Sequence, residues 1–327
     1  MGGRERRDQD FGGQSVVTGQ PEPLKAVPVR HPGRWVAVAV IVVLAAMFAH
    51  LLLTNDAFHW SFMFRNMFTP AVLRGVQGTL LMTVLAMFFG IALGIGVAIA
   101  RLSPNPVLRG VAWVYTWVFR AVPRLVLLAL LGNLNILWPQ ISFGVPFDTY
   151  IGKIFGITDL HLRVFEGQTR NLLTGFVAGL IGLALSEAAY MAEIVRAGMQ
   201  SIDPGQEEAA TALGMRRSQT LRRIVLPQAM RVIIPPTGNE TIAMLKDTSL
   251  LIYVPVTAEL FFQLSAVGSR TFLPFPMYVA ASLWYLAMVS VLLVGQHFLE
   301  RYFARGHRTE QARIRLAGIA GEQGGTL

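Results

Sequence analysis

The sequence contains no cysteine and little charge. The absence of cysteine excludes disulfide bonds, thiol catalysis and cysteine-ligated metal sites. Charged residues make up only 14% of the 327 residues, against about 25% in ordinary soluble domains, which disfavours a soluble globular protein. No G-x-x-x-x-G-K-[ST] sequence occurs, so a P-loop for ATP is excluded. The six histidines show no metal-ligand spacing.

Hydrophobic residues, by contrast, make up 53% of the chain. They cluster in runs of about 20 residues, the length a helix needs to cross roughly 30 Å of hydrocarbon. We therefore predict an all-α polytopic membrane protein. The predicted membrane helices are residues 35–53, 78–100, 111–131, 172–195, a mixed span within 232–266 that is interrupted by prolines, and 277–298. The spacing Gly90-x-x-x-Gly94 predicts close packing of the second helix on a neighbour.

The basic residues predict the orientation of these helices. If residues 1–34 form a disordered cytoplasmic tail, the tails and loops on the cytoplasmic side of the membrane together hold 19 of the 28 Lys and Arg residues. Basic residues are retained in cytoplasmic loops, so both termini are expected in the cytoplasm, with 301–327 as a basic cytoplasmic tail. The net charge of +9 then needs no nucleic acid to explain it.

A polar loop over 203–227 carries the most specific pattern. Asp203 can cap a short helix with Pro204 at its first position and Gln206 at the spacing of a capping box. Gly214 suits the left-handed residue that ends such a helix. Ser218 can cap a second helix that ends toward Pro227. The first helix is too short to span a membrane, and its apolar face predicts a groove on a partner.

The loop resembles the EAA loop of ABC-importer permeases. Glu208-Ala-Ala is followed after three residues by Gly214, and after nine more by Ile224-x-Leu226-Pro227, as in that motif. Flanking sequences extend the resemblance to the polar amino acid permease subfamily and to residues 70–300. These are Glu187-Ala-Ala-Tyr190-x-Ala-Glu193 before the loop, and Pro235-Pro236, Asn239-Glu240 and Lys246-Asp247-Thr248-Ser249-Leu250 after it.

The resemblance implies an architecture and a set of partners. The fold would be a five-helix permease core with 35–53 as an additional N-terminal membrane helix. The short loop helix would dock on a cytoplasmic ABC ATPase, which binds ATP and magnesium, while this chain binds no cofactor and no metal and catalyses no reaction. The implied coupling residues are Glu208, Ala209, Ala210, Leu213, Gly214, Ile224, Leu226 and Pro227.

An identical or homologous permease and an extracytoplasmic solute-binding protein would complete the importer. It would lie in the lipid bilayer of a bacterial inner membrane and translocate polar amino acids.

Ionisable and polar residues inside the spans are the candidates for the substrate path, because such groups are costly in a membrane. The candidates are Arg120, Tyr190, Glu193, Asn239, Glu240, Lys246, Asp247, Thr248, Ser249 and Glu259. Lys246 beside Asp247 favours an internal ion pair over solute contact. Glu193 favours a structural or interfacial role.

One departure from the family bears on the solute. Family members usually read Arg-Gly-Thr-Pro with a Gln four residues after the proline, whereas here Arg120-Ala-Val-Pro123 is followed by Arg124 and by Leu127 in place of Gln. The substitution points either to an unusual or anionic solute or to a partner permease that supplies the missing group. An opine, amine or osmolyte as solute, an intramembrane enzyme, and an ATP-independent channel or carrier are the alternatives.

Overall fold

The computed structural model describes residues 32–144, 154, 163–254 and 256–304. The predicted tails therefore lie almost wholly outside the described residues. The chain divides into two compact units, Met1–Asn55 and Asp56–Leu327. The described part of the first unit is helix α1 (Pro32–Thr54), which contains the predicted span 35–53. Gly33–Thr54 has a mean hydropathy of 2.8 and no buried residue, as expected of a helix whose partner is lipid.

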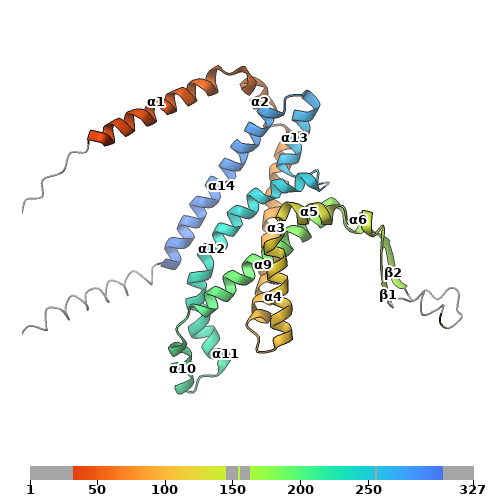
Figure 1. The fold of residues 1–327 in the computed structure, drawn as a ribbon, viewed down its shortest axis with the longest axis vertical. Coiled ribbons are helices and arrows are strands. Elements are labelled where there is room, and N and C mark those ends of the chain that lie inside the picture. Colours follow the sequence, from red (N-terminus) through yellow and green to blue (C-terminus); the bar gives the residue numbers. More distant parts are fainter. Residues whose placement is uncertain (1–31, 145–153, 155–162, 255, 305–327) are drawn as a thin grey trace, which may run out of the picture. The chain divides into compact units, whose positions relative to one another are not determined.

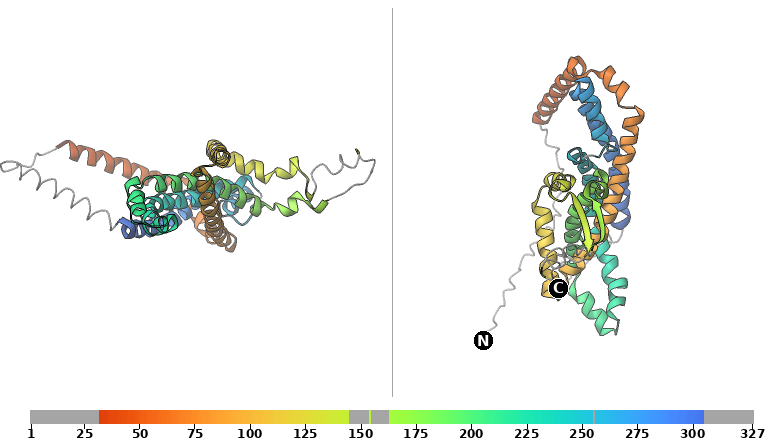
Figure 2. Two further views of the ribbon diagram at one scale, coloured as in Figure 1. Left: turned by 90° about the horizontal axis from the view of Figure 1, so that it is seen from below. Right: turned by 90° about the vertical axis from the view of Figure 1, so that its right-hand side faces the viewer.

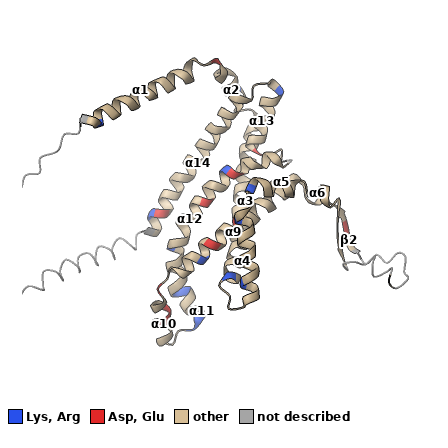
Figure 3. Cartoon of the chain, in the orientation of Figure 1, with Lys and Arg blue, Asp and Glu red and all other residues tan. Residues whose placement is uncertain are grey.

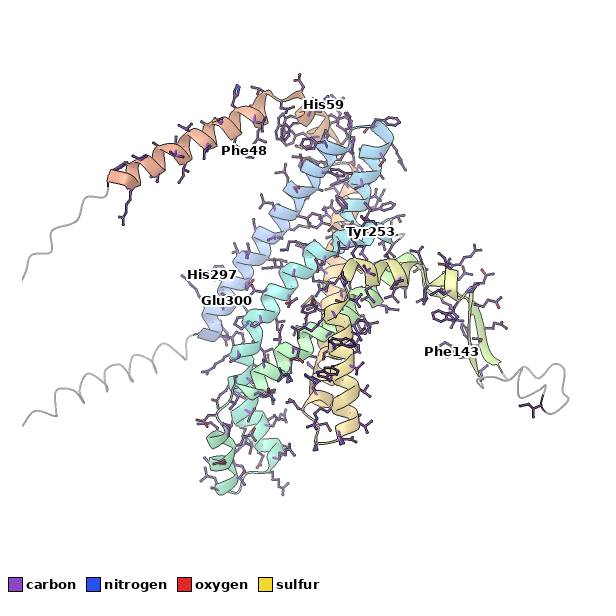
Figure 4. The ribbon with its side chains drawn as sticks, in the orientation of Figure 1. Phe48, His59, Phe143, Tyr253, His297 and Glu300 are labelled. Carbon is purple, nitrogen blue, oxygen red and sulfur yellow. The ribbon has the colours of Figure 1, made fainter. Side chains whose placement is uncertain are left out.

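The second unit is built almost entirely of helices (Figure 1). In chain order its elements are η1 (Asp56–Phe58), α2 (Trp60–Asn66), α3 (Pro70–Arg101), α4 (Pro106–Ala121), α5 (Arg124–Gly132), α6 (Leu134–Leu137), β1 (Gln140–Gly144), β2 (Arg163–Gln168), α8 (Thr169–Leu172), α9 (Gly175–Gln200), α10 (Pro204–Ala212), α11 (Arg217–Thr220), η2 (Leu221–Val225), α12 (Leu226–Asp247), η3 (Thr248–Tyr253), α13 (Leu260–Thr271) and α14 (Pro274–Ala304). The strands β1 and β2 pair antiparallel, with Phe143 opposite Phe165, and Phe143 lies at a distance from the long helices (Figure 4).

Glycines allow α3 and α9 to approach closely, as the Gly90-x-x-x-Gly94 spacing predicts. A β-carbon at Gly90 would lie 2.7 Å from Cβ of Glu187, and one at Gly94 would lie 2.6 Å from Cβ of Met191. No larger residue fits at these positions without a shift, because carbon atoms in contact lie about 3.5–4.0 Å apart. The pair forms the centre of the second unit, and apolar side chains from α5, α12 and η3 pack around it. Leu128, Met244 and Leu251 come from these three elements and pack with Met82 of α3 and Leu183 of α9.

The predicted span 111–131 is bent rather than straight. The helices α4 and α5 meet at an angle of 98°. Val122 between them has an extended backbone, the conformation favoured before a proline, and Pro123 then precedes α5. The bend makes Arg124 the first residue of α5 and brings it to the side of α9 and α12.

In the described part of the chain, four helices are long and apolar enough to cross a membrane, or five if the bent pair forms one span. The four are α1, α3, α9 and α14. The predicted mixed span 232–266 is not among them. It is divided into α12, η3 and α13, and α12, with 22 residues, is long enough but too polar. Its expected interruption at Pro235 and Pro236 is wrong, since both lie inside α12. Thr237 Oγ1 donates to the Ile233 carbonyl in the same stretch of α12.

Candidate functional site

The short helix predicted in the polar loop is present and is capped as expected. It is α10, and Asp203 Oδ1 accepts a hydrogen bond of 2.8 Å from the Gly205 amide. Gly214 has φ +73°, the left-handed conformation that glycine adopts without a steric penalty. The helices α10 and α11 form a hairpin at one end of the second unit, away from the turn between α13 and α14 (Figures 1 and 2).

The exposed face of α10 differs from the predicted one. Glu208 and Ala209 are exposed, and Leu213 is 82% exposed. Ala210 is only 1% exposed, because α10 packs on α11 and η2. Its carbonyl also accepts from the Met215 amide. Ala210 thus forms the inside of the hairpin, and a partner can reach only Glu208, Ala209 and Leu213 of this face.

The second half of the loop also differs from the prediction. Ser218 does not cap α11. The cap is Arg216, whose amide donates to Gln219 Oε1 at 3.0 Å. The helix does not end toward Pro227 either, because the π-helical turn η2 joins α11 to α12. Pro227 is the second residue of α12, and the first N–H groups of an α-helix have no partner within it, so its missing N–H costs α12 no hydrogen bond.

The last part of the coupling motif lies on this continuous helix. Ile224 is half-buried, and both Leu226 and Pro227 are exposed.

The most highly charged group inside the second unit surrounds Arg124. Its Nη1 lies 2.5 Å from Asp247 Oδ2, and its Nη2 lies 2.9 Å from Glu187 Oε2 and 3.7 Å from Glu240 Oε2. Its Nε donates to Ser186 Oγ at 3.0 Å. We call Arg124, Glu187, Glu240 and Asp247 the Arg124 cluster. It joins α5, α9 and α12, and Figure 3 shows charges of both signs where these helices meet.

Tyr190 separates the Arg124 cluster from a second arginine. The Cζ atom of Arg124 lies 4.8 Å from the centre of the Tyr190 ring, and that of Arg120 lies 5.5 Å from it. Both distances are within the range of cation–π attraction. Arg120 is exposed and forms no ion pair with any described residue. The aromatic ring is therefore close to two guanidinium groups. That of Arg120 has no ion-pair partner among the described residues, and that of Arg124 is paired with carboxylates.

Two open cavities meet at Tyr190. One, of about 390 Å³, is lined by Arg101, Trp113, Thr116, Trp117, Arg120, Ala121, Tyr190 and Glu193. The other, of about 370 Å³, is lined by Arg124, Tyr190, Glu240, Ala243 and Asp247. Volumes of this size are typical of small-molecule sites. Five predicted path residues thus lie together around these cavities: Arg120, Tyr190, Glu193, Glu240 and Asp247.

Glu193 has the structural role that the sequence favours. Its Oε1 lies 3.2 Å from Arg101 Nη2, and its Oε2 lies 2.7 Å from Arg196 Nη2. The first pair connects α9 to α3 and the second lies within α9. The internal ion pair that the sequence favours at Lys246 and Asp247 is present for Asp247, which pairs with Arg124 and so joins α12 to α5. Lys246 is exposed and forms no ion pair with a described residue.

The remaining candidates lie away from the cavities. Asn239 Oδ1 accepts from Gln296 of α14, while the hydroxyl groups of Thr248 and Ser249 donate to helix carbonyls three residues earlier. Glu259 is 1% exposed and accepts from Tyr285, from Thr79 and from the Phe262 amide. It fixes the start of α13 against α3 and α14, and has no contact with either cavity.

Three important residues were not among the candidates: Arg124 itself, Glu187 and Arg101. Glu187 forms the buried centre of the Arg124 cluster, with a side chain that is 0% exposed. Its signal was available, since it is a carboxylate inside a predicted membrane span. Arg101 lies just beyond the predicted span 78–100, but it is the last residue of α3 and lines a cavity.

Apolar helices that enclose paired charges and polar cavities define a polytopic membrane transport protein. The chain belongs to the family described as binding-protein-dependent transport system inner membrane component, which matches residues 90–306. It is thus the membrane component of such a transport system.

Individual relatives agree with this assignment. The arginine transport system permease protein ArgU of Corynebacterium glutamicum is 44% identical over 95% of this chain and 93% of that protein. The L-cystine transport system permease protein TcyB of Bacillus subtilis is 32% identical over 78% and 95%. Among solved structures, an amino acid ABC transporter is 31% identical with a TM-score of 0.57, over 72% of this chain and 95% of that chain.

Proposed function

We propose that this chain is the permease subunit of an ATP-driven importer for amino acids. The polarity of the two cavities supports a zwitterionic solute. Arg120 is exposed and can donate hydrogen bonds to a carboxylate, while Glu240 and Asp247, which line the other cavity at Tyr190, can accept hydrogen bonds from an ammonium group. The names of the relatives, which include arginine and L-cystine permeases, support the same class of solute.

The hairpin of α10 and α11 is the single observation that carries the coupling part of this proposal. It presents an exposed carboxylate at Glu208 and an exposed apolar side chain at Leu213. A separate ABC ATPase provides the groove for this helix and binds ATP and magnesium, because the sequence has no P-loop. This chain contributes no catalytic group and no cofactor site.

The proposed orientation places the hairpin in the cytoplasm of a bacterial cell, with both termini on that side of the inner membrane. Arg101 and Arg109 flank the turn between α3 and α4, and Arg216, Arg217, Arg222 and Arg223 lie on the hairpin or directly after it. Both segments lie toward the same end of the second unit (Figure 1). Basic residues are retained on the cytoplasmic side. A solute-binding protein then docks at the opposite end, and a second permease chain completes the pathway.

Substitution of Gly214 tests the coupling. Gly214→Ala places a β-carbon on a residue with φ +73°. This destabilises the turn after α10 by roughly 1–2 kcal/mol, which corresponds to about a tenfold decrease in the population of the docked hairpin. ATPase co-purification and ATP-dependent uptake of radiolabelled amino acids into proteoliposomes should both fall. Gly110→Ala in α4 is the matched control, because a β-carbon there has no atom within 4 Å. Uptake and co-purification at the level of Gly110→Ala would refute the coupling, and uptake without ATP would indicate a carrier or channel.

A further inference from the structure

We infer that the extracytoplasmic end of the second unit carries a binding surface for anionic phospholipids of the outer leaflet. The surface has two parts, the segment around α2 and the turn between α13 and α14, which lie at the same end of the unit (Figure 1). Its exposed residues, which we name the outer collar, are Phe64, Arg65, Arg74, Arg270, Phe272 and Phe275. The outer collar shares no residue with the two cavities, and it is extracytoplasmic in the orientation proposed above.

Packing joins the two parts of the outer collar. Trp284 of α14 donates its indole N–H to the Met67 carbonyl, which follows α2, at 3.0 Å. The ring centres of Phe58 and Phe275 lie 5.2 Å apart, and Met67 belongs to the same buried cluster as Met277 of α14. The outer collar is therefore one exposed side of packed helices and not a set of separate loops.

The outer collar lies at the edge of the hydrocarbon layer. Helix α3 has 32 residues, whereas about 20 residues cross the hydrocarbon of a bilayer. The uncharged part of α3 is 78–100, so the residues before it, among them Arg74, extend into the headgroup layer. Phe272 similarly lies just before Pro274, where the membrane-spanning helix α14 begins. The two parts of the outer collar thus lie at headgroup depth.

The arginines of the outer collar lack a counter-charge. Arg65, Arg74 and Arg270 form no ion pair with a described residue. Among the described residues 56–77 and 256–278, the acidic side chains are Asp56 and Glu259, and Glu259 is buried. Basic residues are disfavoured on the extracytoplasmic side, so three unpaired arginines there indicate a partner outside the chain.

Lipid phosphate is the anion at this depth. Arginine side chains near the ends of membrane helices extend to the interface, where the phosphate groups lie. A headgroup with a net negative charge, such as that of phosphatidylglycerol, neutralises the arginines, whereas a zwitterionic headgroup carries its own cation. Each arginine near an anionic surface strengthens binding about fivefold.

The aromatic residues of the outer collar suit the same environment. Phe272 is 90% exposed and has φ +57°, a left-handed conformation that is unfavourable for a bulky residue. The fold thus retains a strained turn that presents this ring to its surroundings. Phe64 and Phe275 are exposed as well. Aromatic side chains combined with arginine are typical of segments that lie in the membrane interface.

The apolar surface that continues from the outer collar favours a phospholipid over a soluble protein as its occupant. Leu73 and Leu80 are exposed on α3, and Tyr278 is exposed near the start of α14. Both helices are long and apolar enough to span the membrane, so acyl chains cover these side chains. A phospholipid whose chains lie on α3 and α14 has its phosphate at the outer collar.

The absence of cysteine allows a fluorophore to be placed at the outer collar. Ser269→Cys gives an exposed attachment site beside Arg270. The labelled transporter is reconstituted with cysteine-free ATPase subunits into phosphatidylcholine vesicles that contain either dibrominated phosphatidylglycerol or dibrominated phosphatidylcholine, which are short-range quenchers. We expect the phosphatidylglycerol to quench at a concentration at least about fivefold lower, the ratio expected for one arginine. Both leaflets contain the quencher, so the result does not depend on the orientation of the chain.

Substitutions in the labelled protein separate the arginines from the ring. Arg65→Gln, Arg74→Gln and Arg270→Gln, combined, should reduce the ratio to near one. The control Arg301→Gln neutralises an exposed arginine at the other end of α14 and should leave the ratio unchanged. Phe272→Gly removes the ring and relieves the left-handed backbone, so it should weaken quenching by both lipids without changing the ratio.

Equal quenching by the two lipids with all arginines present would overturn the anionic-lipid surface. An unchanged ratio in the triple variant, with normal thermal stability, would overturn the role of the three arginines, and unchanged quenching in Phe272→Gly would overturn that of the ring. Absence of quenching by either lipid, with protection from aqueous iodide when the solute-binding protein is added, would identify a protein-docking surface instead. Each of these results is independent of ATP-dependent amino-acid uptake, which tests the proposed function.

Discussion

The close contact between α3 and α9 leads to a quantitative prediction for Gly94. A β-carbon at this position would lie 2.6 Å from Cβ of Met191 and 3.0 Å from the carbonyl oxygen of Ala188. Neither atom is the end of a flexible side chain, so the two helices must separate by about 1 Å to restore normal contact. Overpacking of this kind typically costs about 1–3 kcal/mol. Gly94→Ala should therefore lower the free energy of unfolding.

Gly96 provides the matched control on the same helix. A β-carbon at Gly96 has no atom within 4 Å, and both substitutions share the gain in helix propensity of up to about 1 kcal/mol. The difference between Gly94→Ala and Gly96→Ala thus isolates the packing cost, about 1–3 kcal/mol. The assay is unfolding of the purified protein by SDS titration, followed by far-ultraviolet circular dichroism. Equal stability of the two variants would refute the reasoning.

Two polar contacts lead to further predictions. Tyr285→Phe removes the 2.5 Å hydrogen bond to Glu259 and should lower the free energy of unfolding by about 1.5–3 kcal/mol in the same assay. The control Ser290→Ala removes an exposed hydrogen bond within α14 and should change it by less than about 0.5 kcal/mol. Similar losses in the two variants would contradict the prediction for Tyr285. Arg101→Gln and Glu193→Gln should show a coupling energy above about 1 kcal/mol in a double-mutant cycle, because the pair is only 17% and 18% exposed. Strict additivity would show that the pair contributes no more than an exposed one.

Much of the hairpin was predictable because its signals are local. The carboxylate of Asp203 caps an amide two residues later, and Gly214 ends α10 in the left-handed conformation. The direction of Ala210 was not predictable in this way. Its exposure depends on where α11 lies, and that position depends on the π turn before α12.

The candidate site was predicted as a set of residue types but not as an arrangement. Tyr190, Glu193, Glu240 and Asp247 were recognised as costly polar groups in membrane spans, and they do line the two cavities. Glu259 met the same criterion and is instead a buried cap for α13. Sequence alone does not separate these roles, because both place a carboxylate in an apolar environment.

The class of protein, the positions of most apolar helices and the caps of the short loop helix are predictable from the sequence, since all of these follow from composition and from contacts within a few residues. The partners of Arg124, by contrast, depend on the tertiary structure. The bend before α5 brings Arg124 against Glu187, 63 residues away, and against Asp247, 123 residues away. An arginine that suggested an anionic solute is thereby surrounded by carboxylates, because the sign of a site depends on every charge that the fold brings within a few ångströms.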